Sequence, residues 1–184
     1  MCGIIAVLRR PSSREVPDLV GLNNLLDSIT SSLSMEDLNT LKKQVDSLDF
    51  VNSQLKGLPG FLALFHNEGL ISQIERNLED ISEFLTNPTD LISFSSDDVE
   101  ALNSSLTMMR DLVWSINNDR IGSYKGVVDL VSKKFDTSSH GFSILLSIQQ
   151  ALSGLDRLEV RGRDSAGLQI LVWDHDLHDD EIPR

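Results

Sequence analysis

The spacing of apolar residues through the middle of the chain leaves little freedom in the fold of that part. Between residues 14 and 136, leucine, isoleucine and valine recur at steps of three and four, which places them on one face of a helix. Successive faces cover residues 19–33, 35–55, 70–85 and 99–116, and a shorter helix is predicted over residues 126–134. Because each helix would carry a single apolar stripe, antiparallel packing into a bundle is the simplest way to bury these residues.

Glycine, proline and asparagine mark the expected ends of these helices. Gly57 and Pro59 interrupt the second face, Pro88 closes the third, and Asn117-Asn118-Asp119 ends the fourth. The short apolar piece at residues 61–65 fits either a strand or a helical turn, and its periodicity does not decide between the two.

An apolar run near each end of the chain is typical of a strand instead. Residues 2–8 are mostly apolar and stop before Pro11, which cannot donate a hydrogen bond to a sheet. Residues 142–160 predict a further helix, and residues 168–173 predict a second strand. The inward face of that helix is expected to comprise Ile144, Leu145, Ile148, Leu152, Leu155 and Leu158. An α+β fold is therefore predicted.

The composition excludes several classes of partner. The 16 basic and 28 acidic residues give a formal net charge of −12, so the chain has no positive field to attract nucleic acid or an anionic membrane surface. No uninterrupted apolar stretch reaches ~18 residues, the length that suggests a membrane-spanning helix. A single cysteine excludes an internal disulfide and fits a reducing compartment. We therefore expect a cytoplasmic protein that binds neither nucleic acid nor membrane.

Cys2 is the only cysteine, and it directly follows the initiator methionine. Removal of Met1 would leave one residue with both a thiol and a free α-amino group. The thiol is a nucleophile when deprotonated, and the amino group, with a pKa of ~7.7–8.0, can act as a general base near neutral pH. The alternative is that Cys2 is a small buried apolar residue, which is the usual role of a lone cysteine.

A second segment matters for the interpretation of Cys2. It reads Arg161-Gly162-Arg163-Asp164-Ser165-Ala166-Gly167. The opening Met1-Cys2-Gly3-Ile4, together with this turn before the second predicted strand, resembles the glutaminase domain of class II glutamine amidotransferases, which are N-terminal-nucleophile hydrolases. The resemblance is closest to glutamine–fructose-6-phosphate aminotransferase. Amidophosphoribosyltransferase and asparagine synthase, which carry related versions of the turn, are the other candidates within the class.

The resemblance implies a reaction and roles for two residues. Cys2 would attack the side-chain amide of glutamine, release ammonia and form a γ-glutamyl thioester, and the ammonia would pass to a sugar phosphate. Arg161 would support the terminus and its loop. The predicted catalytic residues are therefore Cys2, as nucleophile and α-amino base, and Arg161 in a supporting role. We expect neither a metal site nor a cofactor.

The same resemblance implies a divided domain. Residues 1–13 would supply the first strand of a partial αββα glutaminase domain, residues 14–136 a helical insertion, and residues 137–184 the first helix and second strand. The family's Asn-Gly oxyanion pair does not occur in the sequence, and losing one oxyanion donor costs ~10²–10³ in rate. We therefore expect the N-terminal part of an aminotransferase, inactive alone. Its sugar-phosphate acceptor would bind to further domains, and a homodimer or a completing chain is its expected protein partner.

A hypothesis from a different class treats the helices as the functional part. The chain would then be a helical interaction or regulatory module, flanked by relics of amidotransferase motifs. Its task would be oligomerisation or the binding of a partner.

Overall fold

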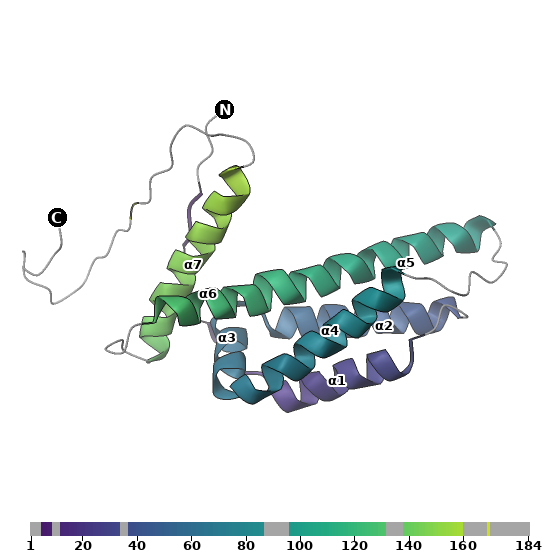
Figure 1. Cartoon of the computed structure of the whole chain (residues 1–184), viewed down its shortest axis with the longest axis horizontal. Coiled ribbons are helices and arrows are strands. Elements are labelled where there is room, and N and C mark those ends of the chain that lie inside the picture. The colour runs from purple at the N-terminus through teal and green to yellow at the C-terminus, as the bar shows by residue number, and fades with distance from the viewer. Residues whose placement is uncertain are drawn as a thin grey trace, which may run out of the picture.

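The computed structural model describes residues 5–8, 12–33, 37–86, 96–131, 138–159 and 169. Every regular element within these residues is a helix, and they include no strand (Figure 1). The elements in chain order are α1 (Leu19–Ser31), α2 (Leu38–Gln54), α3 (Gly57–His66), the 3₁₀-helix η1 (Glu68–Leu70), α4 (Ile71–Thr86), α5 (Ser96–Trp114), the π-helix η2 (Ser115–Ile121), α6 (Gly122–Leu130) and α7 (Ser139–Glu159).

The predicted α+β fold is wrong, and the resemblance to class II amidotransferases is contradicted with it. The described chain is helical, unlike the αββα sandwich of an N-terminal-nucleophile hydrolase. Residues 5–8, the described part of the predicted first strand, pair with no strand there, and the side chain of Ile5 lies against α7. A short apolar run can be buried against a helix as well as in a sheet, so its composition did not distinguish the two. The predicted second strand lies outside the described residues apart from Gln169, and the domain boundaries stay predictions.

The apolar stripes predicted for the middle of the chain are confirmed. α1 packs on α2 and α4, and α5 packs on α2 and α4, so the four helices enclose one core. Figure 1 shows them running alongside one another. Side chains with no exposed surface in this core include Leu26, Leu48, Ile74, Ile81 and Met109.

Aspartates begin the first two helices. Asp18 accepts a hydrogen bond from the amide of Val20 at 3.1 Å, and Asp37 accepts from the amides of Asn39 and Thr40 at 3.0 and 3.1 Å. These bonds satisfy amides that have no partner within the first helical turn. The hydroxyl of Thr40 also donates to Asp37 at 2.7 Å, and this bond is the largest cause of the lowered pKa of the Asp37 carboxyl.

α5, η2 and α6 form one continuous helix over residues 96–130 (Figure 1). The backbone stays in the right-handed helical region at Trp114 and Gly122, on either side of the π-helical turns. The predicted helix end at Asn117-Asn118-Asp119 is therefore wrong. The side chain of Asn118 donates to the carbonyl oxygen of Trp114 at 3.0 Å, so a residue type that commonly ends a helix here bonds within one.

α7 packs on α6 and α3 near one end of the bundle and stands at an angle to the long helix (Figure 1). Its Phe142 lies among aromatic rings, with centroid distances of 4.5 Å to Phe65 and 5.0 Å to Phe61. Phe61 also contacts Tyr124 of α6, at a centroid distance of 5.7 Å. The sequence of residues 61–65 is compatible with a strand or a helix, and the structure places them in α3. There Phe61 and Phe65 form the aromatic surface on which α7 packs.

Candidate functional site

The two residues predicted to be catalytic, Cys2 and Arg161, lie outside the described residues. The structure therefore neither brings them together nor separates them. Within the described ranges, no cluster of three or more His, Cys, Asp or Glu side chains could hold a metal ion. None of the helices described there combines the length and apolar character that a bilayer crossing requires.

A polar cluster joins α2 to the π-helical turns of η2, a type of structure that is frequent at functional sites. Arg120 donates from Nε to the amide oxygen of Asn52 at 2.9 Å and from Nη2 to the hydroxyl of Ser115 at 3.4 Å. The Ser115 hydroxyl lies 3.3 Å from Asn52 Oδ1 and 3.3 Å from Asp119 Oδ2, and can donate to either. Burial lowers the pKa of Arg120 from its ordinary value, but a guanidinium stays charged at neutral pH.

Arg157 connects this polar cluster to α7. Its guanidinium forms an ion pair with Asp119 and lies 5.5 Å from the centroid of the Trp114 ring. Because the Arg157 side chain is largely exposed, the ion pair contributes little to the stability of the fold. The contact joins α7 to the turns of η2 at the surface.

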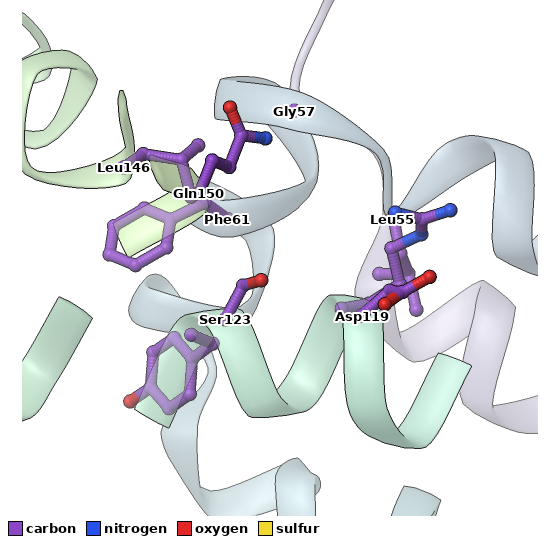
Figure 2. Close-up of a pocket in the computed structure, with 9 residues that line it drawn as sticks. Leu55, Gly57, Phe61, Asp119, Ser123, Leu146 and Gln150 are labelled. Carbon is purple, nitrogen blue, oxygen red and sulfur yellow. The ribbon is translucent and has the colours of Figure 1, made fainter. Parts of the chain in front are cut away.

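A small cavity lies beside the polar cluster, where α3, α6 and α7 approach one another (Figure 2). Its lining includes Leu55, Gly57, Phe61, Ser123, Leu146 and Gln150. The cavity volume of ≈ 20 Å³ has room for about one water molecule. Small-molecule sites are typically roughly 300–1,000 Å³, so this cavity cannot enclose a substrate. We therefore assign the polar cluster a structural role, in which it holds η2 to α2 and α7.

Most of α7 stands out from the rest of the chain because it is uncharged up to Leu155. Residues 141–155 include no Asp, Glu, Lys or Arg, in a chain of which 24% of the residues are charged. One side of this helix packs on the bundle through Phe142, Leu145 and Leu146, which are all buried. That side accounts for the position of α7 but not for the absence of charge elsewhere on the helix.

The opposite side of α7 is also apolar. We define the outer face of α7 as Ile144, Ile148, Ala151 and Leu155, which follow one another at steps of four, three and four and so share one side of the helix. Ile144 is 42% exposed, whereas Ile148, Ala151 and Leu155 are half-buried, and Ile148 also packs against the core. The prediction that Ile144 points inward is therefore wrong.

The N-terminal segment Ile5–Leu8 lies beside α7 (Figure 1). The Cδ1 atom of Ile5 is 2.6 Å, and its Cγ2 atom 3.3 Å, from the position that a β-carbon on Gly154 would take. The absence of a side chain at Gly154 thus lets Ile5 approach the backbone of the helix closely.

Sequence reasoning assigned the chemistry to Cys2 and Arg161 and missed the outer face of α7. The signal was present in residues 141–155, which are uncharged and place apolar residues on more than one side of a helix. Comparisons with protein-family models, with curated proteins and with solved structures found no match for the chain.

Proposed function

We propose that the chain is a helical interaction module that pairs with a second copy of itself through the outer face of α7. One observation carries this proposal: the bundle buries Phe142, Leu145 and Leu146 of α7 but leaves Ile144, on the opposite side of the helix, 42% exposed at the end of a row of half-buried apolar residues. Exposed apolar residues scattered singly need no explanation, but a row along one helix face marks an interaction surface.

Charge favours a second copy at this surface. Each chain carries a formal net charge of −12, so two copies repel each other through most of their surfaces. The repulsion is weakest where both surfaces are uncharged, and residues 141–155 form such a stretch. Depletion of charged residues is also the compositional mark of the centre of a protein interface.

A two-fold axis would make the contact self-complementary. In an isologous pair, the same face of both subunits meets, so Ile144 of one copy would face Leu155 of the partner subunit. Ile148 and Ala151 would lie near the axis. The small side chain of Ala151 would let the two helices approach closely there.

The glutaminase reaction is not part of this proposal, because the fold that it requires is contradicted by the helices of the described chain. Neither glutamine nor a sugar phosphate is therefore proposed as a ligand. We keep the cytoplasm as the proposed compartment, since a single cysteine fits a reducing environment.

Sedimentation equilibrium of the full chain over a wide range of concentration tests the proposal. Wild type should dimerise, and Ile144→Asp should weaken the dimer at least ~100-fold, because two carboxylates would enter an apolar interface. The matched control is Met108→Asp, which adds the same charge at an exposed apolar position of α5 and should leave the dimer unchanged. A monomeric wild type, or equal behaviour of the two variants, would overturn the proposal.

A further inference from the structure

Residues 5–8 lie beside α7 (Figure 1), and Ile5 reaches the helix at Gly154. Ile5 is 37% exposed and Val7 is half-buried, whereas Leu8 is 91% exposed. Ile5 and Val7 are thus better covered by the protein than Leu8.

Gly154 provides the space for this contact. A β-carbon at this position would lie 2.6 Å from Ile5 Cδ1, which is closer than two carbon atoms can approach. Glycine weakens the interior of a helix relative to alanine, so at this position it costs helix stability and provides room for Ile5. Gly154 follows Ala151 by three residues and so is its neighbour on the helix surface, which places the Ile5 contact beside the Ala151 edge of the outer face.

We infer that Ile5–Leu8 is an internal strap that occupies the distal part of α7 and competes with a second copy of the chain for the outer face. The segment is assigned to this part of α7 because Ile5 fills the space that a side chain at Gly154 would take. The inference of competition rests on the proposed self-association, whereas the docking of the strap does not. Release of the strap would make the outer face more available and the dimer tighter.

Nuclear Overhauser effects between the Ile5 Cδ1 methyl group and the α-protons of Gly154, in the full chain with labelled isoleucine methyls, test the docking. The cross-peak should be present in wild type and weaker in Gly154→Ala, where the end of the Ile5 side chain must turn away from the new β-carbon. Gly69→Ala is the matched control, because no atom lies within 4 Å of the β-carbon that it adds. Absence of the cross-peak in wild type would overturn the strap.

Sedimentation equilibrium of the same chains tests the competition. Ile5→Ser and Gly154→Ala should each dimerise about tenfold more tightly than wild type, and Gly69→Ala should match wild type. Unchanged dimerisation in both strap variants would overturn the competition while leaving the dimer itself in place. If wild type and every variant stay monomeric although the cross-peak is present, the proposed self-association fails, and the competition fails with it.

Discussion

The backbone carbonyl of Leu55 occupies the space beside Gly60 that a β-carbon would need. Gly60 is a buried residue of α3, shortly after the bend that joins this helix to α2. The bend is made at Gly57, whose φ of +69° favours glycine. This close approach positions α3, and with it the ring of Phe61 against which Phe142 of α7 packs.

Gly60→Ala should lower the free energy of unfolding by about 2–3 kcal/mol, because backbone atoms cannot move aside as a flexible side chain can. Urea denaturation measures the change. Gly69→Ala, which adds the same methyl group in open space, should change the stability by less than about 0.5 kcal/mol. Equal effects of the two substitutions would contradict the close approach of Leu55 and Gly60.

The bundle could be predicted from the sequence because its stripes are one-sided. Leu26, Leu48 and Ile74 each recur with neighbours at helical spacing and are opposed by polar residues, so the side that is buried follows from the pattern. α7 offers less contrast, since its apolar residues occur on two sides of the helix and the residues between them are uncharged. Periodicity alone could not show that Phe142 faces the bundle and Ile144 faces away.

Two other features could not be predicted from the sequence: the packing of residues 5–8 and the continuation of the long helix through Asn118. Ile5–Leu8 is an apolar run too short to distinguish a strand from a segment packed on a helix, and the described structure gives the second. Asn118 belongs to a residue type that favours turns, yet its side chain bonds within the π-helical turns. Cys2 and Arg161, the predicted catalytic pair, stay predictions without a fold to support them, because they lie outside the described residues.

Asn77→Ala should destabilise the fold by about 2 kcal/mol, because the buried amide bonds a charged group between two helices. Asn77 of α4 donates to Asp27 of α1 at 2.7 Å and lies 3.5 Å from the side-chain oxygen of Asn23. Urea denaturation tests this against Asn103→Ala, an exposed position of α5 where a change below about 0.5 kcal/mol is expected. A similar loss at both positions would show that the α1–α4 bond is not formed.

Asp37 should make stability depend on pH at the acid end. Its pKa is lowered in the folded chain, first by the hydrogen bond from Thr40 and next by the amide of Asn39. The stabilisation is therefore complete above the unfolded pKa of about 3.9 and is lost as the pH falls through the lower folded pKa. Urea midpoints of wild type and Asp37→Asn, measured at a series of pH values, should differ most near neutrality and converge in acid. A difference independent of pH would contradict this role of the carboxylate.

The attachment of α7 should depend on Phe142 far more than on Arg157. Phe142→Ala removes a ring packed against Phe61 and Phe65 and should cost about 3–5 kcal/mol. Arg157→Ala breaks a largely exposed ion pair with Asp119 and should cost less than about 1 kcal/mol. Urea denaturation of both variants gives the comparison, and the reverse order would mean that the aromatic contacts do not hold α7.

The most direct measurement of self-association through α7 is an isotope-filtered nuclear Overhauser experiment on a mixture of labelled and unlabelled chains, which detects only contacts between copies. Cross-peaks should join the methyl groups of Ile144 in one copy to those of Leu155 in the other, as the two-fold arrangement requires. The cross-peaks should disappear in Ile144→Asp and persist in Met108→Asp. Contacts between copies that involve only α1, α2, α4 or α5, or no such contacts at any concentration, would contradict the assignment of α7 as the interaction surface.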